Sequence, residues 1–243
     1  MKRMLLTISY DGTAYHGWQV QPNGITVQQV LQDALERLMG IRPAVTGCSR
    51  TDAGVHADVF YCHFDCEEHF PESAFLKGLN SLLPNDIAVI GCKQVKNDFH
   101  ARYDCKGKKY IYSMYLGVLN PFNERYMLHL EKEPDIELMN KFCYGIIGTH
   151  DFCGFSSSKR TVEDTVRTVT ECKVVKNKNL IFFEIKADGF LYNMVRILAG
   201  TALAVGYGRL KFDCYNNVFE YKDRKYAGDT LSPIGLKLNE VYY

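Results

Sequence analysis

The chain has 243 residues, of which 47% are hydrophobic and 23% are charged, and its formal net charge at pH 7 is +1. This composition is typical of a folded globular protein with one large domain or two small ones, and the net charge alone does not indicate a nucleic-acid binder. The longest apolar run, residues 194–208, contains Arg196 and is shorter than the roughly 20 residues of a membrane span. The N-terminus turns polar too early for a signal peptide, so we expect a cytoplasmic protein.

The first half of the chain predicts helices and strands in the order β-α-β-β-α-β. Thr26 and Gln29 form a capping box at the start of one amphipathic helix, and Gly40 ends it. The second helix stops at Pro84. The predicted strands cover 3–12, about 43–49, 59–66 and 87–95, and the helices cover 26–40 and 71–83.

The second half repeats this order. Strands are predicted over 108–117, in a hairpin over 166–189 and over 234–243, and helices over 135–148 and 190–208; 125–131 can form an extra strand. Residues 155–165 are expected to be an exposed mobile loop, and 212–233 a helix or an irregular excursion. The pattern predicts an α+β fold of two tandem ferredoxin-like (split β-α-β) units, 1–105 and 106–243, with side-by-side antiparallel sheets and a basic cleft between them.

The densest group of reactive side chains is the stretch GCSRTDAGVHA, residues 47–57. In one interpretation Asp52 caps a tight turn that Gly54 completes with a positive φ. In the other, Arg50 binds a phosphate or keeps the carboxylate of Asp52 ionised, and Asp52 is a nucleophile. His56 is expected to be a structural hydrogen-bonding residue, Trp18 a packing residue and Asp11 a turn residue.

Two other features have a structural explanation beside a functional one. Between residues 93 and 109 there are six basic residues and two acidic ones. Lysines are interleaved with tyrosines in KGKKYIYSMY, a mixture that suits phosphates and stacked bases. We therefore expect Arg102 and residues 106–109 to line an RNA groove. The nine cysteines include no C-x-x-C pair and predict buried reduced thiols. A metal-dependent hydrolase that uses Cys62, Cys66 and His69 is an alternative. The neighbouring His63 lies in the same cluster, but an alternating strand points its side chain to the opposite face.

SRTDAGVHA resembles the signature of the TruA-type tRNA pseudouridine synthases. The resemblance continues in the family's usual order through four further segments that span nearly the whole chain: SYDGTAYHGWQVQPNGITVQQVLQDAL, DFHARYDCKGKKYIY, ADGFLYNMVRILAGT and AGDTLSPIGLKL. It implies an isomerase that detaches uracil from its ribose, rotates it and rejoins it through carbon. Motifs for nucleotide cofactors and zinc hydrolases are missing from the sequence, and the resemblance implies neither a cofactor nor a metal.

The resemblance also implies roles for individual residues. Asp52 corresponds to the catalytic aspartate, Tyr110 to a tyrosine that stacks on the target base, Arg50 to an arginine that occupies the vacated stack after base flipping, and Arg196 to an arginine that pairs with the aspartate. The implied substrates are uridines at positions 38 to 40 in the anticodon arm of tRNA, bound by a homodimer. Attack on the sugar, attack on the base and a glycal route all stay open, and a non-catalytic RNA-binding protein on the same scaffold is the main alternative.

Overall fold

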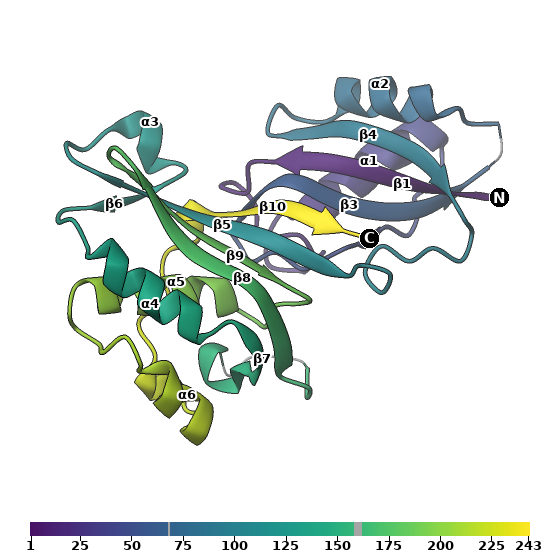
Figure 1. Cartoon of the computed structure of the whole chain (residues 1–243). Helices are drawn as coiled ribbons and strands as arrows, with labels where there is room; N and C mark the ends of the chain where they lie inside the picture. The colour runs from purple at the N-terminus through teal and green to yellow at the C-terminus, as the bar shows by residue number, and fades with distance from the viewer. Residues whose placement is uncertain (68, 158–161) are drawn as a thin grey trace. The chain divides into compact units, whose positions relative to one another are not determined.

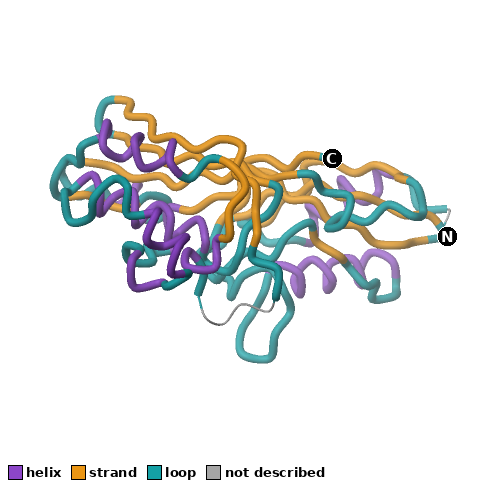
Figure 2. Tube along the Cα trace, turned by 60° about the horizontal axis from the view of Figure 1, so that its bottom comes forward, coloured by secondary structure: helices purple, strands orange, loops and turns teal. Residues whose placement is uncertain are grey.

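The computed structural model describes residues 1–67, 69–157 and 162–243, which divide into two compact units (Figure 1). Unit 1 comprises Met1–Lys106 and Lys237–Tyr243, and unit 2 comprises Gly107–Leu236. Each unit combines helices with a mostly antiparallel sheet, so the fold contains both α and β structure, as the sequence predicts. The strands run beside one another in each unit, with the helices next to them (Figure 2).

Unit 1 contains the predicted order of helices and strands. The central strand β1 is antiparallel to both of its neighbours, and the last strand of the chain, β10, lies parallel to β3. The strand order is β4-β1-β3-β10, and the short β2 also pairs with β3. The elements are β1 (Lys2–Tyr10), α1 (Val27–Met39), β2 (Thr46–Gly47), β3 (His56–Cys66), α2 (Glu72–Leu82), β4 (Ile87–Val95) and β10 (Leu236–Tyr242).

The ends of α1 follow from its sequence. The side chain of Thr26 accepts a hydrogen bond from the backbone N of Gln29, which satisfies one of the amides that a helix leaves unpaired at its start. Gly40 adopts the left-handed conformation, and its N–H donates to the carbonyl of Glu36. The predicted limits of this helix are therefore confirmed. Its buried face consists of Val27, Leu31, Ala34 and Leu35.

Unit 2 is built on the antiparallel strand order β5-β9-β8-β7, with β6 parallel to β5. The long helix α5 is buried along almost its whole length. None of the helices in the described part of the chain is long and apolar enough to cross a membrane. The elements are β5 (Gly107–Leu116), α3 (Pro121–Glu124), β6 (Leu128–Leu130), α4 (Ile136–Gly145), β7 (Gly148–Asp151), β8 (Val166–Asn177), β9 (Leu180–Ala187), α5 (Met194–Gly206) and α6 (Tyr215–Tyr221), with 3₁₀ helices η1 (Phe152–Phe155), η2 (Arg224–Tyr226) and η3 (Pro233–Gly235).

The prediction of an exposed loop over 155–165 is wrong at both of its ends. Phe155 belongs to η1 and is fully buried, and Ser156 and Thr165 are also buried. Asp151 holds these ends together, because its Oδ1 accepts hydrogen bonds from the backbone N of Cys153 and from the hydroxyl of Thr165. Residues 158–161 of the predicted loop lie outside the described residues.

Candidate active site

The polar stretch between β2 and β3 folds into a tight turn, which we call the aspartate turn (residues 51–55). The backbone N of Val55 donates to the carbonyl of Asp52 at 3.2 Å, and Gly54 has a φ of 78°. This positive φ is the one predicted for Gly54, since a residue with a Cβ adopts it only at a cost. Asp52 is half-buried in the turn, and Arg50 is exposed two residues earlier.

Residues 10–18, which begin at the last residue of β1, pack against the aspartate turn, and we call this segment the cradle. The backbone N of Trp18 donates to the carbonyl of Thr51 at 3.2 Å, and the backbone N of Gly54 donates to the carbonyl of Tyr15 at 3.1 Å. The hydroxyls of Tyr10 and Thr51 lie 2.9 Å apart and form a buried hydrogen bond. The cradle thus fixes the turn on both sides of Asp52.

The approach of the two backbones requires a glycine at position 17. Gly17 has a φ of 83°, and a Cβ atom built on it would lie 2.4 Å from the carbonyl oxygen of Thr51. Next to it, Trp18 is buried, and its ring centroid lies 4.2 Å from that of Phe60. The structure therefore agrees with the prediction that Trp18 is a packing residue.

His56 and Asp11 connect the cradle to the start of β3. The backbone N of Gly12 donates to Nδ1 of the buried His56 at 3.0 Å, and Oδ1 of Asp11 lies 3.1 Å from the same ring nitrogen. Oδ1 of Asp11 also accepts hydrogen bonds from the backbone N and the hydroxyl of Thr13. Asp11 is thus a turn residue and His56 a structural hydrogen-bonding residue, as expected from the sequence.

Tyr110 and Arg196 belong to unit 2. Tyr110 lies on β5 and is 5% exposed, and the edge-to-face contact between its ring and that of Phe190 has a centroid distance of 5.1 Å. Arg196 lies in the first turn of α5, where its Nε donates to the carbonyl of Leu231 at 2.7 Å and its Nη1 to Oδ1 of Asn193 at 2.8 Å. Two acceptors therefore orient the guanidinium.

Asn193 is a neighbour of Arg196 that the sequence does not predict. It precedes α5 with a φ of 60°, a conformation that asparagine tolerates better than most residues. Its side-chain oxygen accepts from Arg196, while its Nδ2 donates to the hydroxyl of Ser157 at 2.8 Å. The spacing of three residues between Asn193 and Arg196 in YNMVR is the feature of the sequence that could have predicted this contact.

The basic stretch 93–109 contains fewer available cations than its sequence predicts. Nζ of Lys109 lies 3.1 Å from Oε2 of Glu184 on the neighbouring strand, and Lys108 is buried. Lys108 and Lys109 are therefore less available to a phosphate than their sequence suggests, and the RNA groove over 106–109 stays a prediction. Arg102 and Lys106 are exposed.

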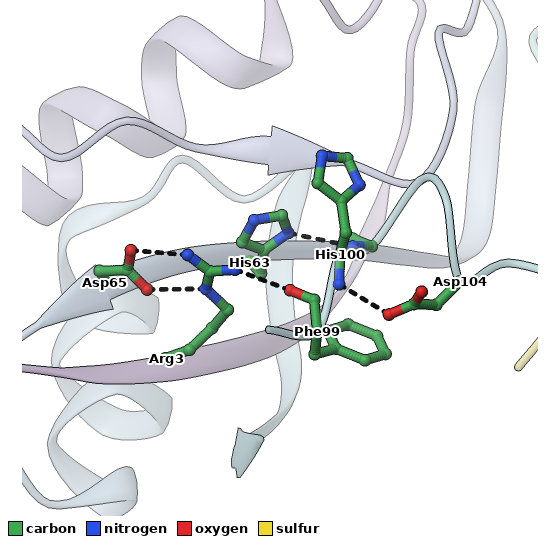
Figure 3. A network of polar contacts seen from close by, with 7 residues as sticks. Arg3, His63, Asp65, Phe99, His100 and Asp104 are labelled. Carbon is green, nitrogen blue, oxygen red and sulfur yellow. Dashed lines mark hydrogen bonds and ion pairs between the residues drawn. The ribbon is translucent and has the colours of Figure 1, made fainter. Parts of the chain in front are cut away.

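The segment 98–104 is fixed on the sheet of unit 1 by a polar network (Figure 3). Arg3 donates to both carboxylate oxygens of Asp65 at 2.8 Å and to the carbonyl of Phe99 at 2.9 Å. The carboxylate raises the pKa of Arg3, and the guanidinium lowers that of Asp65. Nδ1 of the buried His63 accepts from the backbone N of Ala101 at 3.1 Å. The exposed Arg102 therefore follows a rigidly held backbone.

Acidification is expected to destabilise unit 1 through His63. Burial, helped by the charge of Arg3, lowers the pKa of His63 to about 4, below the usual value of roughly 6.5. The unfolded chain therefore binds the proton first, and stability that is present above pH ~6.5 is lost as the pH falls toward 4. Allowing for solvent screening, the free energy of unfolding should drop by about 1 to 2 kcal/mol between pH 7 and pH 5.

Urea unfolding at the two pH values measures this effect. His63→Gln should show a smaller drop than the wild type, whereas His69→Gln, which changes an exposed ring in the same unit, should keep the full drop. An equal drop in all three proteins would show that His63 is not responsible.

The cysteines form no metal centre in the described residues. Cys62 and Cys66 are buried, and burial raises the pKa of the Cys62 thiol well above its usual value, which opposes the thiolate that a metal requires. His69 is exposed and lies 3.2 Å from a carboxylate oxygen of Glu67. Within the described ranges, no three His, Cys, Asp or Glu side chains are grouped to hold a metal ion.

Comparison with known proteins shows similarity along the whole chain. A family model described as tRNA pseudouridine synthase matches residues 6–104 and 143–243. Proteins called tRNA pseudouridine synthase A are 45% identical over 244 residues in Clostridium kluyveri, 43% over 247 residues in Lacticaseibacillus casei and 42% over 248 residues in Thermoanaerobacter sp.. Each alignment covers 100% of this chain and 100% of the relative. The segments matched by the family model include Arg50, Asp52 and Arg196, and Tyr110 falls between them.

Proposed function

We infer the details of the reaction from the premise that this chain belongs to the tRNA pseudouridine synthase family and is therefore an isomerase of uridine in tRNA. In our proposal it modifies positions 38 to 40 of the anticodon arm, with Asp52 as its nucleophile. The observation that carries the assignment of Asp52 is the aspartate turn. Hydrogen bonds from Trp18 and to Tyr15 fix the residues on either side of the half-buried carboxylate. A carboxylate held in this way is preorganised for attack.

The other three residues take roles around the same uridine. Arg50, whose side chain is exposed two residues before Asp52, enters the stack that the flipped base leaves and offsets part of the few kcal/mol that flipping costs. Tyr110 stacks on the flipped base, with its ring supported by Phe190. Arg196, oriented by Leu231 and Asn193, pairs with Asp52. We also propose that residues 1–105 and 106–243 are two ferredoxin-like halves with a basic cleft between them, the last strand of the second half, β10, being the one that pairs with β3.

The reaction itself is an exchange of bonds within one nucleotide. The bond between N1 of uracil and C1′ of ribose breaks, a bond between C5 and C1′ forms, and the proton of C5 is replaced by one on N1. No oxidant, reductant or hydrolytic water enters the balance, and the proposal includes no cofactor and no metal. The proposal leaves open whether Asp52 attacks the sugar, attacks the base or acts in a glycal route.

The proposed assembly is a cytoplasmic homodimer in which both subunits contact one tRNA. A modest number of exposed cations, such as Arg102 and Lys106, then acts twice across a two-fold axis. Symmetry in this way increases the number of phosphates that a chain with a net charge of +1 can neutralise.

Mapping pseudouridine in tRNA tests the proposed substrate. Purified protein is incubated with unmodified tRNA transcripts, and pseudouridine is located by carbodiimide labelling and primer extension. New pseudouridine at positions 38, 39 or 40, without added metal or cofactor and in the presence of a chelator, is the expected result. Modification elsewhere in the tRNA would contradict the proposed position, and binding without any modification would favour the non-catalytic alternative.

A further inference from the structure

The hydrogen bond between Tyr10 and Thr51 links the end of β1 to the residue before Asp52. The two hydroxyls lie 2.9 Å apart, and the residues are 4% and 7% exposed. The pairing register of β1 with β3 shifts between Ile8 and Tyr10, and a shift of this kind changes the direction of the side chain that follows. The irregular end of β1 thus presents the Tyr10 hydroxyl to the aspartate turn.

The Tyr10 ring belongs to a buried aromatic cluster that fixes its hydroxyl. Its centroid lies 5.7 Å from that of Phe60, and the centroid of Phe60 lies 4.2 Å from that of Trp18. All three residues are 4% exposed or less. Trp18 also donates its backbone N–H to the carbonyl of Thr51, so one rigid cluster holds Thr51 by both its side chain and its backbone.

We infer that Tyr10 is a positioning residue for the isomerisation, which acts through the Thr51 hydroxyl to fix the carboxylate of Asp52. This inference rests on the proposed role of Asp52. Without the Tyr10 hydroxyl, the buried Thr51 hydroxyl loses this hydrogen-bond partner. Because an unsatisfied buried polar group is costly, the Thr51 side chain rotates toward another partner. Thr51 then turns, and the adjacent carboxylate moves away from the reacting atoms. Displacements of this kind reduce turnover even when the substrate still binds.

Tyr10→Phe keeps the ring and removes only the hydroxyl. We expect kcat for pseudouridine formation to fall about 10- to 30-fold with KM for tRNA within about 2-fold of the wild type. Thr51→Val removes the other hydroxyl with little change in shape and should have the same effect. The double variant should lose no more than either single variant, because both substitutions break one bond.

Tyr243→Phe is the matched control. It removes a tyrosine hydroxyl of unit 1 that donates to the carbonyl of Ala101, 2.7 Å away and outside the aspartate turn. Its kcat should stay within about 2-fold of the wild type. The folded fraction of every variant is measured by urea unfolding under the assay conditions, so that kcat refers to folded protein.

Wild-type kcat in both folded Tyr10→Phe and folded Thr51→Val would overturn the inference, and so would multiplicative losses in the double variant. If Tyr10→Phe does not fold, the Thr51→Val result alone decides, since the turn keeps its backbone hydrogen bonds. Asp52→Asn is assayed in parallel. Activity in that variant defeats the proposed role of Asp52, whereas an inactive Asp52→Asn beside fully active Tyr10→Phe and Thr51→Val defeats only the inference about Tyr10.

Discussion

Asp52→Asn is expected to reduce pseudouridine formation at least about 1,000-fold while the Kd for tRNA stays within about 3-fold of the wild type. Asparagine has nearly the same size and can still cap the turn, so the hydrogen bond from Val55 to the carbonyl of residue 52 should persist. It lacks the negative charge and the nucleophilic oxygen that the reaction requires. Release of tritium from tRNA labelled at C5 of uridine measures turnover, and filter binding measures affinity.

Asp33→Asn is the control for this substitution. Asp33 lies on α1, where its carboxylate pairs with Arg42 at the surface, and the same chemical change there should leave turnover unchanged. Turnover of Asp52→Asn above about 1% of the wild-type value would remove Asp52 from the role of nucleophile. A large loss of affinity would instead indicate that Asp52 organises the RNA-binding surface.

Gly17→Ala is expected to cost about 3 kcal/mol of the free energy of unfolding or more, and to lower turnover of the folded protein about 100-fold. The left-handed φ of 83° alone costs an alanine about 1 to 2 kcal/mol. The added Cβ would also lie 2.4 Å from the carbonyl oxygen of Thr51 and 3.1 Å from the carbonyl carbon of Asp52. The cradle and the turn must therefore separate, and Asp52 moves with the turn. Urea unfolding and the tritium assay measure the two effects.

Gly40→Ala separates the steric effect from the conformational one. Gly40 has a φ of 78°, close to that of Gly17, but a Cβ built on it would meet nothing within 4 Å. This variant should lose about 1 kcal/mol and keep its turnover. Equal losses of stability and activity in both glycine variants would show that the close approach to Thr51 has no special importance.

The sequence predicts features that depend on neighbouring residues. The cap at Thr26, the end of α1 at Gly40 and the positive φ of Gly54 follow from backbone and side-chain preferences that act over a few residues. The β-α-β-β-α-β order of unit 1 follows from the periodicity of apolar residues in the same way. Local signals of this kind need no knowledge of what packs against them.

Contacts between distant segments were not predictable in this way. The Tyr10–Thr51 hydrogen bond spans 41 positions, and the pairing of Lys109 with Glu184 depends on the register between two strands. Burial of Phe155 and Thr165 depends on the packing of η1 and on Asp151. The polar residues around them therefore suggested an exposed loop that the fold does not form at these two positions. At the site, the family resemblance suggested Asp52 and Arg50, whereas the cradle that holds the turn became visible only in the fold.

The path of the chain through unit 1 has a consequence for biosynthesis. The chain leaves unit 1 after Lys106 and returns at Lys237, where β10 pairs with the first residues of β3 through Lys237–His56 and Leu238–Ala57. During translation, all of unit 2 is therefore made before β3 receives this neighbour. Loop-closure entropy opposes such a distant pairing until the intervening chain is compact. The strand that begins directly after the aspartate turn is therefore completed late, and a nascent chain carries Asp52 before the sheet next to it has all of its strands.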